Sequence, residues 1–237
     1  MLRIRVVLVE PESEGNVGAV ARAMKNFQIE DLVLVKPCPL DVEARKRAMH
    51  GAPILSAAQS FDDIDRAILG AGLVVGTSGI ETESEKRFAR IAMTPRDLAA
   101  HVAPLEGTLA IVFGREDFGL YDEELAKCDL LVTIPASKEY PILNLSHAVA
   151  ILLYELSLPR TPRPHRRESS GMEKEKLHAA LTALLEATDY PSHKRVRTRI
   201  MFRRLLGRAA PSKWEFHALM GVFQRATKRI QRLEAKR

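Results

Sequence analysis

LAIVFGREDFGL, residues 109–120, joins a run of five apolar residues to a charged loop between two glycines. The run is apolar throughout rather than alternating, which predicts a strand covered on both faces. Gly114 and Gly119 permit a tight turn with close approach of the backbone. Arg115 and Glu116 in this turn are candidates to contact a ribose, a phosphate or each other, although an ordinary charged turn would have the same pattern.

Similar apolar runs lie on both sides of this stretch, and helical patterns separate them. With Leu109–Phe113, the expected strands are Ile4–Val9, Leu32–Val35, Leu73–Val75 and Leu131–Ile134. The expected helices are Asn16–Phe27, Asp41–Met49, Phe61–Leu69, Pro95–His101, Asp122–Lys127 and Asn144–Leu156. Strands that alternate with helices predict a parallel α/β sheet, whose ligands bind beyond the carboxyl ends of the strands.

A proline-rich, charged stretch divides the chain. Residues 158–171 show no apolar period and are expected to be a linker between an α/β domain, residues 1–157, and a small domain, residues 172–237. Helical spacing in the small domain predicts helices over Met172–Thr188, Lys194–Leu206 and Ser212–Leu233. The last of these should begin with a capping box formed by Ser212 and Glu215.

The two parts carry opposite charge. Residues 1–157 have a net charge of −7 and residues 158–237 a net charge of +13, within an overall +6. A basic module favours a polyanionic partner, most commonly nucleic acid, although a merely solvated surface has the same composition. We expect no membrane partner, because no apolar run could span a bilayer and the basic segments lack an aromatic, leucine-rich face.

Other chemistries are disfavoured by what the sequence lacks. The start of the chain shows no signal-peptide pattern, and Cys38 and Cys128 lie 90 positions apart, so we expect a cytoplasmic chain without a zinc framework. His50, His101 and His147 share no metal-ligand spacing, so no metal is expected.

The loop EGNVGAVARAMK, residues 14–25, follows the first expected strand and opens a helix. Gly15 and Gly18 do not complete the GxGxxG pattern of dinucleotide-binding loops. Gly18 and Arg22 are four positions apart and so stand one helical turn from each other. We expect the missing side chain at Gly18 to clear room for a bulky ligand beside the Arg22 guanidinium.

A third loop, IPASKEYPILNLSHA, spans residues 134–148 and follows the last expected strand. Its backbone amides and carbonyls could hold an adenine without charged side chains. A plain strand–helix connection with Asn144 as N-cap fits the pattern equally well. Residues 76–79, GTSG, are not the GxSxG of a hydrolase nucleophile.

Together, the three loops resemble the three motifs of the SpoU (TrmH-like) branch of the SPOUT methyltransferases. The matching patterns are Asn16-x-Gly-x-x-x-Arg22, then Phe113-Gly-x-Glu116-x-x-Gly-Leu120, then Ile134-Pro and Leu143-Asn-Leu-Ser146. They follow the family order over about residues 3–157. VLVE at 7–10, VVGTS at 74–78 and RRLLGRA at 203–209 look most similar to TrmJ-type enzymes, which methylate nucleotide 32 of the tRNA anticodon loop.

The resemblance implies an α/β fold whose sheet is followed by a deep trefoil knot, with a small C-terminal helical domain. The knot would form a pocket for S-adenosylmethionine, and the active site would be completed across a homodimer interface. By position, the cofactor would contact Thr77, Ser78, Gly79, Gly114, Glu116, Ile134, Ile142, Leu143 and Asn144. The family often has serine where this chain has Ile142, so a backbone contact to adenine would persist there but a hydroxyl contact would not.

The resemblance also assigns catalysis. The essential arginine of the family falls on Arg22, with Asn16, Glu116, Asn144 and Ser146 at the other motif positions. Since a guanidinium is effectively always protonated, we expect Arg22 to bind the adjacent phosphate and to stabilise charge on the developing alkoxide rather than to act as the base.

In the basic tail, Arg203, Arg204 and Arg208 are the candidates for contacts to the tRNA backbone. Trp214 and Phe216 could stack on bases, but core packing is the favoured interpretation for both.

The resemblance therefore implies S-adenosylmethionine-dependent 2′-O-methylation of a tRNA ribose, at nucleotide 32 of the anticodon loop, and we expect no DNA partner. The alternatives are methylation of ribosomal RNA or of another tRNA position, and a non-catalytic RNA-binding module of the same fold. Another nucleotide-binding α/β enzyme is disfavoured because the phosphate-loop motifs are missing.

Overall fold

The computed structural model describes residues 2–79, 92–158 and 170–235. The chain forms two compact units, Met1–Pro164 and His165–Arg237. In the described ranges, no helix is long and apolar enough to cross a membrane. Residues 159–169 of the expected linker lie outside the described residues.

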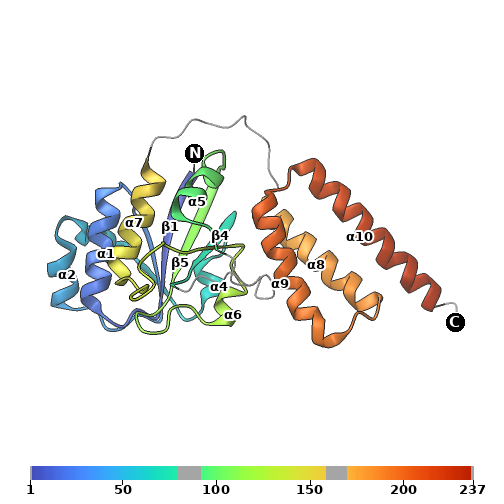
Figure 1. Ribbon diagram of the computed structural model, residues 1–237, viewed down its shortest axis with the longest axis horizontal. Helices are drawn as coiled ribbons and strands as arrows, with labels where there is room; N and C mark the ends of the chain where they lie inside the picture. The colour runs from blue at the N-terminus through green and yellow to red at the C-terminus, as the bar shows by residue number, and fades with distance from the viewer. Residues whose placement is uncertain (1, 80–91, 159–169, 236–237) are drawn as a thin grey trace. The chain divides into compact units, whose positions relative to one another are not determined.

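The first unit is built on a six-stranded sheet with the order β3-β2-β1-β5-β4-β6, and all its pairings are parallel (Figure 1). The strands are β1 (Leu2–Val9), β2 (Asp31–Val35), β3 (Gln59–Phe61), β4 (Leu73–Thr77), β5 (Gly107–Phe113) and β6 (Leu130–Val132). Because β1 and β5 are central neighbours, the loops that follow them open at the same edge of the sheet.

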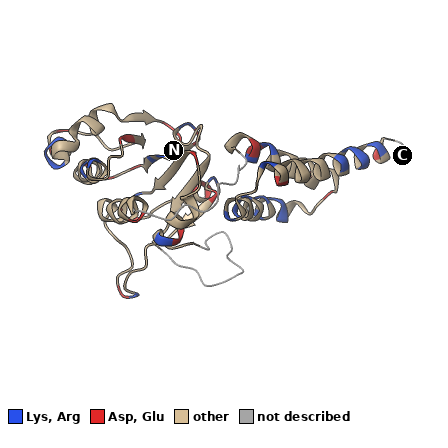
Figure 2. Cartoon of the chain, turned by 90° about the horizontal axis from the view of Figure 1, so that it is seen from above, with Lys and Arg blue, Asp and Glu red and all other residues tan. Residues whose placement is uncertain are grey.

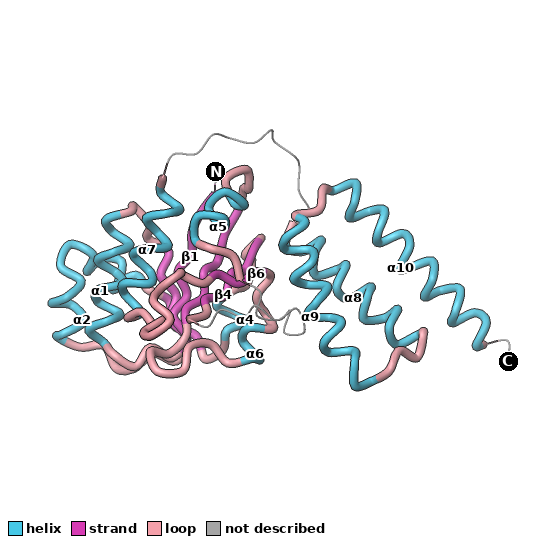
Figure 3. The backbone as a smooth tube through the Cα atoms, viewed as in Figure 1, coloured by secondary structure: helices cyan, strands magenta, loops and turns pink. Residues whose placement is uncertain are grey.

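Helices cover both faces of this sheet (Figure 3). They are α1 (Glu14–Asn26), α2 (Val42–Ala48), α3 (Ala52–Ala57), α4 (Ile64–Ala67), α5 (Pro95–Val102), α6 (Asp122–Leu125) and α7 (Leu145–Ser157), with a 3₁₀ turn at Met49–Gly51. Val6 and Leu8 of β1 belong to the core shared with α1, α3, α5 and α7. Val7 and Val9 point to the opposite core, which α4 and α6 close. The uniformly apolar strands thus have the two-sided burial that their composition predicts.

The parallel α/β prediction is confirmed, and each of the five expected strands is present with end shifts of one to two residues. Two local features differ. The polar segment Gln59–Phe61 pairs with β2 as an edge strand, so the helix expected over Phe61–Leu69 shrinks to α4. The short helix α3, which was not expected, fills the connection between α2 and β3.

The second unit contains three helices in the described range, α8 (Gly171–Ala187), α9 (Ser192–Ala209) and α10 (Lys213–Glu234). Their common core consists of Leu177, Leu181, Leu185, Phe202, Leu206 and Phe216. The expected capping box at Ser212 is confirmed: Ser212 Oγ accepts from the Glu215 amide while the Glu215 carboxylate accepts from the Ser212 amide. Ser170 and Glu173 begin α8 in the same way.

Candidate active site

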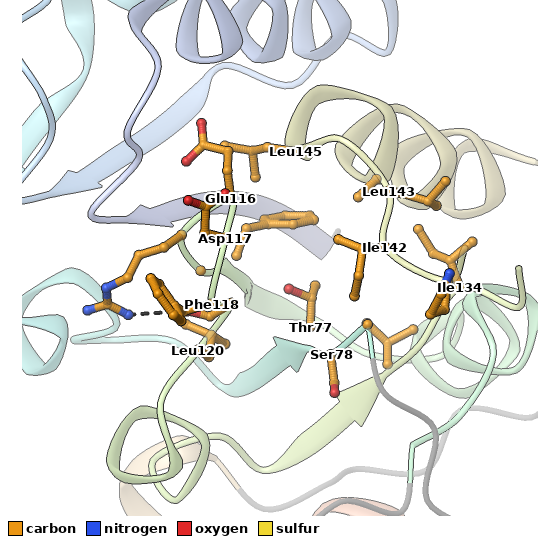
Figure 4. A pocket seen from close by; sticks show the side chains of 18 of the residues that line it. Thr77, Ser78, Glu116, Asp117, Phe118, Leu120, Ile134, Ile142, Leu143 and Leu145 are labelled. Carbon is orange, nitrogen blue, oxygen red and sulfur yellow. Dashed lines mark hydrogen bonds between the residues drawn. The ribbon is translucent and has the colours of Figure 1, made fainter. Parts of the chain in front are cut away.

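A cavity of about 310 Å³ lies at the carboxyl ends of β4, β5 and β6 (Figure 4). Its walls come from the residues after β4, the loop after β5, and the segment that leads from β6 into α7. Ile134, Ile142 and Leu145 provide apolar surface, whereas Thr77 and Ser78 add hydroxyl groups to the lining. The Thr77 hydroxyl donates to the Val112 carbonyl at 3.1 Å. The site therefore lies where ligands of parallel α/β sheets bind.

The loop after β5 is folded back tightly against itself. Arg115 and Gly119 form an isolated antiparallel bridge, with N–H···O distances of 3.2 and 2.9 Å. A Cβ atom at Gly114 would lie 2.1 Å from the carbonyl carbon of Gly119, and Gly119 itself has φ +66°. Both glycines are therefore required by geometry, as the sequence predicts.

The side chain of Arg115 links this loop to Glu10, Glu124 and Tyr121. Its Nε donates to Glu10 at 2.9 Å, its two terminal nitrogens donate to Glu124 at 3.0 and 2.9 Å, and the guanidinium lies 3.9 Å from the centre of the Tyr121 ring. The side chain is only 6% exposed. The hydrogen bonds that Arg115 donates to Glu124 and Glu10 raise its pKa. Glu10 and Glu124, rather than Glu116, take up this guanidinium in the described part of the chain. Arg115 also lines the cavity, so its contact with a ribose or a phosphate stays a prediction.

Four motif residues from three loops form one chain of hydrogen bonds, which we call the motif network: Glu116, Asn16, Asn144 and Ser146. Asn16 Nδ2 donates to Glu116 Oε1, and Asn144 Nδ2 donates to Asn16 Oδ1, each at 2.9 Å. Ser146 donates to Asn144 Oδ1 through its hydroxyl at 2.7 Å and its amide at 2.9 Å. Residues 100 or more positions apart are thus joined directly.

Glu116 also caps the start of α1. Its carboxylate accepts from the backbone amides of Glu12 at 2.8 Å and Ser13 at 3.2 Å, in addition to Asn16. An anion next to the N-terminal end of a helix is favourable because the unpaired amides point toward it. This geometry gives Glu116 a positioning role within the chain.

Gly18 serves a different purpose from the one that the sequence suggests. A Cβ atom there would lie 2.1 Å from the Ala44 carbonyl oxygen of α2. The missing side chain allows α1 and α2 to touch, and the space is filled by protein. The expectation that Gly18 clears room for a bulky ligand was wrong, because the expected helix α2 packs against this position and the pattern around Gly18 does not reveal that contact.

Arg22 is exposed on α1 and does not line the cavity. In the described part of the chain, no hydrogen bond or ion pair holds its guanidinium. Gly51 packs against the backbone of Ala21 and Arg22, which fixes the helix but leaves the arginine side chain free to reach outward. Within one chain, Arg22 and the cavity are therefore separate.

The structure brings most of the expected cofactor residues together. Thr77, Ser78, Gly79, Gly114, Glu116, Ile134, Ile142 and Leu143 all line the cavity, while Asn144 lies beside it as the N-cap of α7. Further lining residues that were not anticipated are Asp117, Phe118, Leu145, Ala148 and Leu152. The α7 members could have been found from the apolar periodicity of Asn144–Leu156.

In the second unit, the three arginine candidates have different environments. Arg204 is 3% exposed, so it is unsuited to contact the backbone of a tRNA. Gly207, about one turn further along α9, is buried on the same helix. Arg203 makes a bidentate ion pair with Glu175, with N···O distances of 2.7 and 3.0 Å. Arg208 is exposed. The interpretation of core packing holds for Phe216, which is buried, but was wrong for Trp214, which is 78% exposed.

Comparisons with known proteins agree with this geometry. A family model described as the SpoU rRNA methylase family matches residues 3–154. The tRNA (cytidine-2′-O-)-methyltransferase TrmJ of Methanocaldococcus jannaschii is 39% identical and aligns over 94% of this chain and 100% of its own length. The tRNA (cytidine/uridine/adenosine-2′-O-)-methyltransferase TrmJ of Pseudomonas aeruginosa is 36% identical over 99% and 98% of the two chains.

A solved structure shows the same likeness in three dimensions. The crystal structure of TrmJ from Z. mobilis superposes with a TM-score of 0.73 at 27% identity, covering 93% of this chain and 97% of that one. The match of the family model to most of the first unit, and the relatives aligned along the whole chain, agree with the three motif loops around one cavity. The chain belongs to the SpoU rRNA methylase family.

Proposed function

We propose that this protein transfers a methyl group from S-adenosylmethionine to a ribose 2′-hydroxyl of tRNA. The observation that carries the proposal is the joining of all three motif loops by the motif network beside one cavity. The names of the M. jannaschii and P. aeruginosa relatives support tRNA as the substrate class.

The cavity suits such a cofactor. Its volume of about 310 Å³ falls at the lower end of the roughly 300–1,000 Å³ typical of small-molecule sites. Ile134, Ile142 and Leu145 would pack against the adenine, and Thr77 and Ser78 would face polar groups of the molecule. When bound, the cofactor supplies an electrophilic methyl group on a sulfonium.

The contribution of the chain is chiefly positioning. The motif network and Arg115 hold the loop after β5 and the start of α7 at fixed separations, so the pocket is shaped before a ligand enters. Holding the two reactants in line converts a bimolecular step into an effectively unimolecular one. The apolar walls also limit the access of water to the reacting groups.

Arg22 would act on the RNA. A permanently charged guanidinium can bind the phosphate next to the target ribose and stabilise negative charge on the 2′-oxygen while the hydroxyl proton passes to water or to a phosphate oxygen. Because Arg22 does not line the cavity of its own chain, we propose that a second copy supplies it and that the active unit is a homodimer.

The same proposal includes a knot, a role for each part of the chain and a target nucleotide. A trefoil knot would be formed by the segment that runs from β6 into α7, next to the cavity. Residues 1–157 would carry catalysis, residues 158–171 would link, and residues 172–237 would bind RNA in the cytoplasm. Nucleotide 32 of the anticodon loop is the proposed target.

Methyl transfer from labelled S-adenosylmethionine to bulk tRNA, with mapping of the labelled nucleotide, tests this proposal. We expect label on a 2′-oxygen at position 32. In a parallel reaction with ribosomal RNA, label on that RNA and none on tRNA would contradict tRNA as the substrate. Arg22→Lys should lose most turnover while cofactor binding persists, and near-full turnover would contradict the role of Arg22. Arg66→Lys, a 70% exposed arginine side chain on α4, is the matched control.

A further inference from the structure

The outward face of α10 combines one aromatic residue with a row of cations. Trp214, Arg225, Lys228, Arg229 and Arg232 are all exposed, and at 3.6 residues per turn they point to the same side of the helix. We call this set the α10 basic face. Figure 2 shows the recurring blue bands of Lys and Arg along the part of α10 that leads to the C-terminus.

The opposite side of α10 is already occupied. Phe216 is buried in the core of the second unit, and Leu219, Met220 and Phe223 pack against that core. An amphipathic helix that binds a membrane needs its apolar side free for the lipid. The α10 basic face therefore offers charge and one aromatic ring, without an apolar side available for insertion.

The cations of this face are available for a ligand. Within the described residues, no salt bridge joins Arg225, Lys228, Arg229 or Arg232 to a carboxylate, in contrast to Arg203 and Arg195 on α9, which pair with Glu175 and Asp189. Their spacing of three, four and seven positions places four positive charges within roughly 10 Å along the axis. Charge complementarity thus points to a polyanion with closely spaced phosphates.

Trp214 distinguishes between polyanions. It is 78% exposed and lies roughly 16 Å from Arg225 along the helix axis. At Gly221, between them, a Cβ atom would meet nothing within 4 Å, so the face is open along this stretch. An exposed indole gains little from phosphate alone but stacks well on an unpaired base.

We propose that the α10 basic face binds an unpaired stretch of RNA, with Trp214 stacked on a base and the cations of the helix on the following phosphates. The inference rests on the proposed function, in that the polyanion is the RNA substrate, and it adds the binding surface and the single-stranded state of the segment bound.

Trp214 is the sole tryptophan of the chain, so its fluorescence reports on this surface alone. We expect oligocytidylate of roughly ten nucleotides, a length within the usual range of single-strand sites, to quench the emission of the full-length protein. A fully paired RNA duplex and inorganic polyphosphate should quench far less. Equal quenching by polyphosphate, or a change on anionic lipid vesicles with none on RNA, would overturn the proposal.

Substitutions separate stacking from charge. With a labelled oligocytidylate, Trp214→Ala should weaken binding at least fivefold, and Trp214→Phe should restore most of it. Arg225→Gln with Arg229→Gln should lower the slope of log Kd against log salt by about 1.4, or 0.7 for each phosphate contact. Lys176→Gln with Arg199→Gln, exposed cations of α8 and α9, is the control of equal charge and should change little.

Two further outcomes keep this proposal distinct from the proposed function. Quenching by oligocytidylate without any methyl transfer to tRNA would support the α10 basic face and contradict the methyltransferase. Normal methyl transfer, with oligonucleotide affinity unchanged in both the Trp214→Ala and the Arg225→Gln/Arg229→Gln proteins, would overturn the α10 basic face and leave the methyltransferase intact.

Discussion

The motif network and the α10 basic face are built on opposite principles. In the first, Asn16 binds Glu116 and Asn144, so its polar groups are satisfied within the protein. In the second, the cations carry no carboxylate partner in the described part of the chain. A site satisfied by its own side chains has its shape before the ligand arrives, whereas an open charged face takes its order from the ligand. Substitutions should therefore disturb folding and cofactor affinity in one region and only RNA affinity in the other.

The largest effect is expected from Arg115→Ala. Its guanidinium is almost fully buried between Glu124 and Glu10. Its removal leaves the largely buried Glu124 carboxylate, which keeps the hydrogen bond from the Tyr121 amide, without a compensating cation. We expect the free energy of unfolding of the first unit to fall by about 3 kcal/mol, measured by urea denaturation. Arg66→Ala, an exposed pair with Asp63, should change it by less than about 0.5 kcal/mol. Equal unfolding midpoints for the Arg115→Ala and Arg66→Ala proteins would contradict the stabilising role of Arg115.

The next largest effects are expected from two glycine-to-alanine substitutions, which should change the free energy of unfolding in opposite directions. Gly18→Ala would place a Cβ atom 2.1 Å from a backbone oxygen of Ala44 and should destabilise the first unit by about 2 kcal/mol. Gly221→Ala, in the open centre of α10, should stabilise the second unit by about 0.5–1 kcal/mol through helix propensity. Thermal unfolding that resolves both units would test this, and two shifts of the same sign would contradict it.

A smaller effect should follow from Asn16→Asp. The change removes the donor to Glu116 and places a second carboxylate at the 2.9 Å contact. We expect S-adenosylmethionine to bind about tenfold more weakly, or about 1.4 kcal/mol, at neutral pH by calorimetry. Like charges raise the pKa of the pair, so the deficit should shrink as pH falls and one carboxyl regains a proton. Asn26→Asp at the exposed end of α1 is the control; a deficit independent of pH would argue against a charge effect.

The smallest effect concerns Glu175 on α8. Burial acts to raise its pKa, but the hydrogen bonds and charge of Arg203 outweigh this, so the pKa is lowered on folding. A lowered pKa contributes stability above the unfolded value, near pH 4.3, which is lost as pH falls through the folded value. Glu175→Gln should therefore cost about 0.5 kcal/mol at pH 7, a small figure because Glu175 is 61% exposed. The cost should vanish near pH 3, and thermal unfolding at both pH values measures it.

The sequence predicts strands well where burial on two faces forces uniform apolarity. Leu109–Phe113 and Leu32–Val35 have this composition and are strands. Gln59–Phe61 does not: its three residues are a strand only because they pair with Val33–Val35. Edge pairing of this kind is imposed by the tertiary structure and leaves no local signal.

The features of the candidate site also divide into those that the sequence predicts and those that depend on tertiary contacts. The resemblance to the family motifs identified eight of the residues that line the cavity, because the glycines, the asparagines and the charged loop that carry it are visible in the sequence. Their partners were not visible, since Arg115 reaches Glu10 and Gly18 meets Ala44 across long sequence separations. In the tail, helical spacing alone could not separate the buried Arg204 from the exposed Trp214, because which sides of a helix are covered depends on its neighbours.

The position of β1 in the sheet has a consequence for the way the protein is made. β1 lies between β2 and β5, and Val7 pairs with both Val33 and Val112. Its second edge stays open until the ribosome has added about a hundred more residues, on the order of ten seconds at typical elongation rates. During that interval, an apolar strand with unpaired amides is exposed to aggregation and to chaperones. Synonymous changes that slow translation between β2 and β5 should therefore lower the soluble yield without altering the finished enzyme.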